Sequence, residues 1–192
     1  VTDFDATMES LKKFTPGAGW NGSNYTDVNG IEKENFYLLY QDTYVLGKGY
    51  GHASISVDDN EEIYYSFNFK GFRREKPRKH EDIVSKSVCY KLSVSKEEYD
   101  KVVEMIDEFQ SRRFEWKYNL AGLLLSRLHI KRQKKDHYFC SEFVAEMLQR
   151  ANVAEFKKST AHYLPNRLEQ EVKKFQNLEQ VIFNPIQRSY CA

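Results

Sequence analysis

Cys140 is the residue of this chain best placed to act as a nucleophile. It precedes a segment in which Phe143, Val144, Met147 and Leu148 recur at helical spacing, and this spacing predicts a helix with Cys140 in its first turn, on the inward side. Unpaired amides and the positive end of the macrodipole at a helix start favour a thiolate over a thiol. A thiolate here can attack a carbonyl carbon, and the same amides can donate to the oxyanion that forms.

A cysteine nucleophile also needs a base, and His52 is the best candidate among five histidines. It opens a predicted strand over residues 52–57 and shares a face of that strand with Ser54 and Ser56. These small neighbours leave space beside the imidazole for another element to pack. The other four histidines lie in polar or loop segments: His80, His129, His137 and His162.

The remaining thiols are less suited to chemistry. Cys89 lies in an alternating segment over residues 87–93 that predicts a strand, where a cysteine is most simply a small packed hydrophobe. Cys191 is the penultimate residue. Three cysteines are too few, and odd in number, for a disulfide framework, which favours a reducing, cytoplasmic compartment over a secreted location.

Composition limits the classes of protein that fit. The 192 residues are 41% hydrophobic, which predicts a single domain over residues 1–192. The 29 basic and 28 acidic residues nearly cancel, so no overall field favours nucleic acid. The sequence has no apolar run long enough for stable membrane insertion, and the first residues lack the basic and apolar regions of a signal peptide.

The predicted elements that must position Cys140 and His52 alternate between strands and helices. Ser95 and Glu98 form a capping box that begins the best-marked helix. The turn Asp58–Glu61 joins two strands into a hairpin over residues 52–69. The other expected elements are a helix over 8–14, a strand over 35–44, a basic loop over 70–80, an apolar helix over 118–128 and an exposed loop over 129–137.

Two segments together resemble a known family. The strand Gly51-His52-Ala53-Ser54-Ile55-Ser56-Val57 and the later Tyr138-Phe139-Cys140-Ser141-Glu142-Phe143-Val144 are similar to the circularly permuted NlpC-type cysteine hydrolases of the papain-like superfamily. The resemblance covers roughly residues 36–170, and residues 1–35 form an extension without a counterpart. It implies an α+β papain-like fold, in which an antiparallel sheet or small barrel packs against the cysteine helix.

The resemblance also implies roles for individual residues. Cys140 would be the nucleophile and His52 the general base of an amide or ester hydrolase that forms an acyl-thioenzyme. A polar residue on the return strand, which is the second strand of the hairpin and covers residues 62–69, would orient the imidazole. Ser66 is the first candidate and Asn68 the second. No acidic residue stands at the matching place on that strand, which departs from the commoner pattern and predicts weak support for an imidazolium. Tyr118 resembles a family tyrosine that helps to form the oxyanion hole.

Several alternatives remain open at this point. Lipid acyltransferases of the lecithin:retinol acyltransferase type use a similar histidine and cysteine, and an inactive binding module could keep the same fold. A zinc site would need Cys89 and His80 beside His137 and Cys140. Nucleic-acid binding has only the basic loops in its favour. The expected substrate is a peptide, a peptidoglycan-like amide or an acyl group, and no metal or other cofactor is required.

Overall fold

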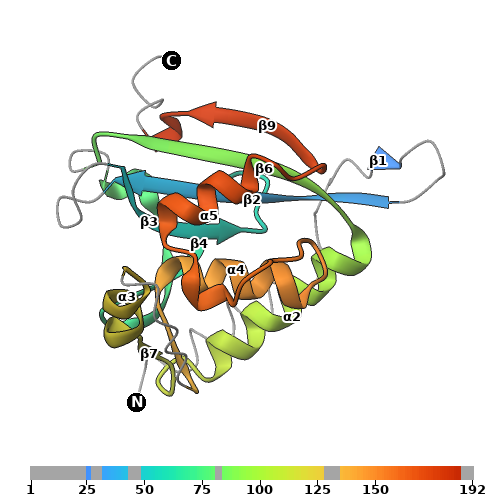
Figure 1. Cartoon of the computed structure of the whole chain (residues 1–192). Helices are drawn as coiled ribbons and strands as arrows, with labels where there is room; N and C mark the ends of the chain where they lie inside the picture. The colour runs from blue at the N-terminus through green and yellow to red at the C-terminus, as the bar shows by residue number, and fades with distance from the viewer. Residues whose placement is uncertain (1–24, 27–31, 43–48, 81–83, 128–134, 187–192) are drawn as a thin grey trace, which may run out of the picture.

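The structure is a computed structural model that describes residues 25–26, 32–42, 49–80, 84–127 and 135–186. It has an α+β fold in which an antiparallel sheet is covered on one face by helices (Figure 1). The strands of the main sheet are β1 (Tyr25–Thr26), β2 (Glu32–Asp42), β3 (Tyr50–Ser56), β4 (Tyr64–Asn68), β5 (Gly71–Glu75), β6 (Ser87–Ser95) and β9 (Leu178–Phe183). The α-helices are α2 (Lys96–Ser111), α3 (Leu120–Arg127), α4 (Cys140–Arg150) and α5 (Pro165–Val172).

The sheet has the strand order β5-β4-β3-β2-β6-β9, and β1 pairs with β2 outside this path. Each of these pairings is antiparallel. The short strands β7 (Lys117–Tyr118) and β8 (His137–Tyr138) form a separate parallel pair just before α3 and α4. Two short 3-10 helices, η1 (Pro77–His80) and η2 (Thr160–His162), complete the described elements.

The centre of β2 is buried on both faces of the sheet, because its residues alternate between two clusters. Phe36, Leu38 and Tyr40 enter the large core beneath α2, α4 and α5. Tyr37 and Leu39 point to a smaller cluster on the opposite face. The central residues of β2, 36–40, thus separate the two buried clusters.

The predicted helix after Ser95 is confirmed. The Ser95 hydroxyl accepts from the backbone amide of Glu98 at 3.3 Å, and the Glu98 carboxylate accepts from the Ser95 amide at 2.8 Å. This capping box satisfies two amide donors that a helix start leaves unpaired. The predicted hairpin is likewise confirmed, since β3 and β4 pair with Ile55 opposite Tyr65.

The prediction of a basic loop over residues 70–80 is wrong. Residues 71–75 form β5, which pairs with β4 along its whole length, and η1 follows. The strand begins at Gly71, whose φ of +89° favours glycine, and whose Cβ would lie 2.5 Å from the carbonyl oxygen of Trp116. Phe72 anchors it in the core. Its other residues are charged because β5 is an edge strand with exposed side chains.

Some expectations fall on residues that the structure does not describe. They are the helix over 8–14, Cys191 and most of the loop over 129–137. The predictions of one domain and of an amino-terminal extension therefore stay predictions. Within the described residues, no helix combines the length and the apolar character needed to cross a membrane.

Candidate active site

Cys140 is the first residue of α4, and it is only 2% exposed. Phe139 before it has an extended backbone, so the helix starts abruptly at the cysteine. Phe143 seats the helix on the sheet, with its ring centroid 5.3 Å from that of Phe67 on β4. The inward placement predicted from helical spacing is confirmed, and it turns the first turn of α4 toward the body of the protein.

His52 lies near the start of β3, opposite Gln41 of β2. Its side chain is 12% exposed, and the Cys140 thiol lies close enough to the imidazole to raise its pKa. Asn166 of α5 fixes the backbone leading into this strand, because its Oδ1 accepts from the amide of Tyr50 at 2.7 Å. Two residues that lie 88 positions apart in the sequence are thus brought together by α4 and β3.

Glu75, at the end of β5, is the side chain that supports the imidazole. Its Oε2 lies 2.9 Å from Nε2 of His52, and its side chain is 20% exposed. Since Nε2 is engaged by Glu75, Nδ1 is the ring nitrogen left to exchange a proton with Cys140. The order Cys140, His52, Glu75 is that of a nucleophile, a base and a carboxylate that orients the base.

The charge state of His52 follows from these neighbours. Burial alone would lower the pKa of His52, because it penalises the charged ring. The negative charge of Glu75 and the hydrogen bonds with Cys140 and Glu75 act in the opposite direction and outweigh burial. The pKa of His52 is therefore raised well above its ordinary value of 6.5, which favours the imidazolium at neutral pH.

Ser66 and Asn68, the two expected orienting residues, have hydrogen-bond partners other than the imidazole. Ser66 donates its hydroxyl to the carbonyl oxygen of Ala53 at 2.7 Å in the buried interior, and Asn68 Oδ1 accepts from the Lys70 amide at 2.9 Å. These side chains hold the β3–β4 hairpin and its following turn instead of the imidazole. The carboxylate that contacts the imidazole belongs to the next strand, β5.

Tyr118 lies on β7, near the start of α4. Burial raises the pKa of its hydroxyl, and a negative charge on Cys140 raises it further, so the two groups are close enough to interact electrostatically. The Tyr118 ring also contacts Phe69, with 4.9 Å between ring centroids. Its place beside the nucleophile suits the predicted oxyanion role, which stays a prediction.

His137 and Cys89, two residues of the metal alternative whose side chains the structure describes, have other contacts. His137 Nδ1 lies 2.8 Å from the carbonyl oxygen of Lys135, and Cys89 is buried against the hydroxyl of Tyr64 at 3.6 Å. Among the described residues, no group of three or more His, Cys, Asp or Glu side chains is arranged so that it could hold a metal ion. The side chain of His80 lies outside the described residues.

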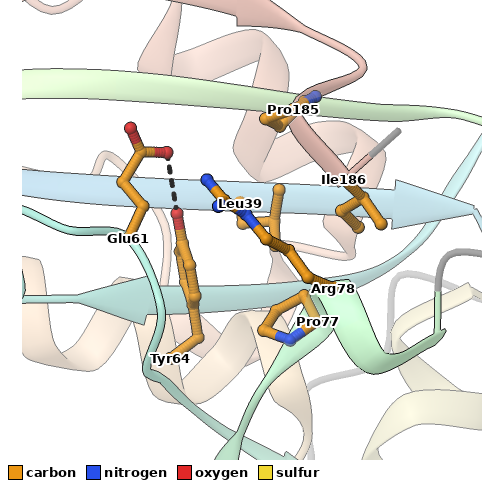
Figure 2. A pocket seen from close by; sticks show the side chains of 7 residues that line it. All are labelled: Leu39, Glu61, Tyr64, Pro77, Arg78, Pro185 and Ile186. Atoms are coloured by element: carbon orange, nitrogen blue, oxygen red, sulfur yellow. Dashed lines mark hydrogen bonds between the residues drawn. The ribbon is translucent and has the colours of Figure 1, made fainter. Parts of the chain in front are cut away.

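A small pocket lies on the side of the sheet that carries the smaller buried cluster, and Leu39 of that cluster lines it. Figure 2 shows the side chain of Arg78 reaching from η1 toward Glu61 and Tyr64, whose hydroxyl donates to Glu61 at 3.3 Å. Its lining is Leu39, Glu61, Tyr64, Pro77, Arg78, Pro185 and Ile186. None of these residues belongs to the candidate active site.

Comparisons with known proteins cover only part of the chain. One family model, for a family that is uncharacterised, matches residues 1–64. That match includes His52 but neither Glu75 nor Cys140. No curated protein and no solved structure matches the chain.

Proposed function

We propose that this protein is a cysteine hydrolase in which Cys140, His52 and Glu75 form the catalytic unit. The observation that carries the proposal is the 2.9 Å contact between His52 Nε2 and Glu75, made by a ring close enough to the Cys140 thiol for that group to raise its pKa. A carboxylate in this place fixes the tautomer of the histidine and stabilises its imidazolium form.

The reaction that fits these residues is acyl transfer through a thioester. The Cys140 thiolate attacks the carbonyl carbon of an amide or ester, and the carbonyl π electrons move to oxygen to form a tetrahedral oxyanion. The oxyanion collapses, the bond to the leaving group breaks, and the His52 imidazolium protonates the departing nitrogen or oxygen. A water molecule then attacks the carbonyl carbon of the thioester while neutral His52 takes a proton from that water. The Cys140 thiolate leaves, and the acid product is released.

The fold is consistent with a circularly permuted papain-like domain of the NlpC type. In support, the histidine strand β3 precedes the cysteine helix α4 in the sequence, and α4 packs on the antiparallel sheet (Figure 1). The substrate class that this resemblance favours is a peptide or a peptidoglycan-like amide. The chemistry of the three side chains requires no cofactor.

An acyltransferase or esterase acting on lipids is the second candidate. It is favoured by exposed apolar side chains next to Tyr118: Phe69 is 71% exposed, Leu120 48% and Leu124 54%. Leu120 and Leu124 are one turn apart on α3, so their side chains lie on the same face of the helix. Such a surface suits the acyl chain of a lipid substrate.

Trapping of the acyl-thioenzyme tests the proposal and separates the candidates. The protein would be incubated with a peptidyl p-nitrophenyl ester or a long-chain acyl p-nitrophenyl ester, and the adduct mapped by mass spectrometry. We expect a hydroxylamine-sensitive acyl group on Cys140 and none in Cys140→Ala. Faster acylation by the peptidyl ester supports the hydrolase, and preference for the acyl chain with transfer to an added alcohol supports the acyltransferase. If neither ester gives an adduct, the result contradicts both enzyme candidates and supports an inactive binding module on the same fold.

A further inference from the structure

A second acidic residue is buried beside the proposed nucleophile. Glu142 lies in the first turn of α4, two residues after Cys140, and its side chain is fully buried. Glutamate is almost never fully buried unless it is paired with other polar groups. Its contacts therefore indicate what it does in this position.

One oxygen of Glu142 joins three segments of the chain. Oε2 accepts from the amide of Phe139 and from Nδ2 of Asn119, each at 3.3 Å. Asn119 in turn donates its amide to the carbonyl oxygen of Tyr138 at 2.9 Å, and its Oδ1 accepts from Gly122 of α3 at 2.9 Å. This joint connects the start of the cysteine helix to β8, to β7 and to the first turn of α3.

The joint is close-packed on its α3 side. A Cβ added at Gly122 would lie 2.2 Å from Nδ2 of Asn119, so no larger residue fits there without displacing the amide. Tyr118, the expected oxyanion donor, directly precedes Asn119 on β7. The position of Tyr118 relative to Cys140 is thus tied to the contact between Asn119 and Glu142.

Only one of the two oxygens of the Glu142 carboxyl group has hydrogen-bond partners among the described residues. The Oε1 atom of Glu142 has no hydrogen-bond partner among the described residues. Burial raises the pKa of Glu142 to about 7, although the amides of Phe139 and Asn119 lower it in part, and the nearby carboxylate of Glu146 raises it. The charge of Glu142 also acts on the pKa of Tyr138 of β8, and Cys140 lies two residues earlier on α4.

We propose that Glu142 is a positioning residue, whose neutral form holds the Tyr118–Asn119 segment against the start of the Cys140 helix and whose ionised form loosens that contact. This inference rests on the proposed function of Cys140. An ionised carboxylate with one buried and unpaired oxygen is costly, and opening the joint to water relieves that cost. A negative charge in the first turn also opposes a thiolate at Cys140.

The test is the pH profile of Cys140 alkylation by iodoacetamide, from pH 5.5 to 9, in the wild type and in Glu142→Gln. Glutamine keeps the size and the acceptor oxygen but cannot ionise. We expect the two rates to agree within about twofold below pH 6.5, and the wild type to be roughly three- to tenfold slower above pH 7.5. Glu155→Gln, an exposed carboxylate beyond the end of α4, is the matched control and keeps the wild-type profile. Identical profiles for Glu142→Gln and the wild type would overturn the proposal.

A second measurement uses the wild type alone, in case Glu142→Gln does not fold. Amide hydrogen exchange at Asn119 is corrected for its intrinsic pH dependence, and protection is expected to fall between pH 6 and pH 8. Constant protection contradicts the inference. This readout does not depend on catalysis, so it separates failure of the Glu142 joint from failure of the proposed hydrolase, which is tested at His52 and Cys140.

Discussion

His52 Nε2 lies 2.9 Å from Oε2 of Glu75, although the two residues belong to strands separated by β4 in the sheet. This contact distinguishes a supported base from an isolated histidine beside a buried thiol. It also raises the pKa of His52 against the opposing effect of burial. The reactivity expected of Cys140 depends on this contact between His52 and Glu75.

Replacement of Glu75 by glutamine should slow Cys140 chemistry. The amide cannot stabilise an imidazolium as a carboxylate does, so we expect hydrolysis and iodoacetamide alkylation to fall at least about tenfold at pH 7. Glu62→Gln, an exposed residue in the connection between β3 and β4, is the control and should behave as the wild type. Equal rates for wild type and Glu75→Gln would show that the carboxylate has no part in the reaction.

The protonation of His52 should be visible in its pH titration. Because its pKa is raised in the folded state, the stabilisation from the pair is fully present below pH 6.5 and is lost as pH rises through the folded value. NMR of the ring should find the imidazolium at pH 7 in the wild type and a lower midpoint in Glu75→Gln. A wild-type midpoint at or below 6.5 would contradict the assigned pairing.

Removal of the Ser66 hydroxyl should affect stability and leave the chemistry unchanged. Ser66→Ala loses the buried hydrogen bond to Ala53 and leaves that carbonyl without this donor, at a cost of about 1 to 3 kcal/mol in the free energy of unfolding. Urea denaturation measures this loss. Alkylation of Cys140 should stay within about twofold of the wild type, and a larger loss of reactivity would restore Ser66 as an orienting residue.

A hydroxyl that acts in the oxyanion hole should matter only when an oxyanion forms. For Tyr118→Phe we expect a loss in kcat of roughly one hundredfold with little change in KM. Alkylation by iodoacetamide forms no tetrahedral oxyanion and should be unaffected. If both reactions slow together, Tyr118 shapes the site and does not donate to the transition state.

The sequence predicted the elements that carry local signals. Ser95 and Glu98 marked the start of α2, and the spacing of apolar residues after Cys140 marked the inward face of α4. Both signals are contained within one helical turn or one periodic stripe. Cys140 and His52 could therefore be selected from their residue types and from their positions at the start of a predicted helix and a predicted strand.

Glu75 could not be found in the same way. It lies in the charged run Arg73-Arg74-Glu75-Lys76, and such a run is typical of a loop. An edge strand can carry the same charged residues, because it exposes side chains that a central strand would bury. Only the pairing of β5 with β4 brings its carboxylate to His52. The one local signal was Gly71 before Phe72, which is typical of a turn followed by a strand.

The most direct test of the central claim compares Cys140 alkylation in the wild type and in His52→Ala. Iodoacetamide would be used near pH 7, with the modified cysteine identified by mass spectrometry so that Cys89 and Cys191 are counted separately. We predict fast alkylation of Cys140 in the wild type and a rate at least about tenfold lower in His52→Ala, with thermal unfolding showing that both are folded. Equal, slow alkylation of Cys140 in the two folded proteins would contradict the proposal that His52 activates this thiol.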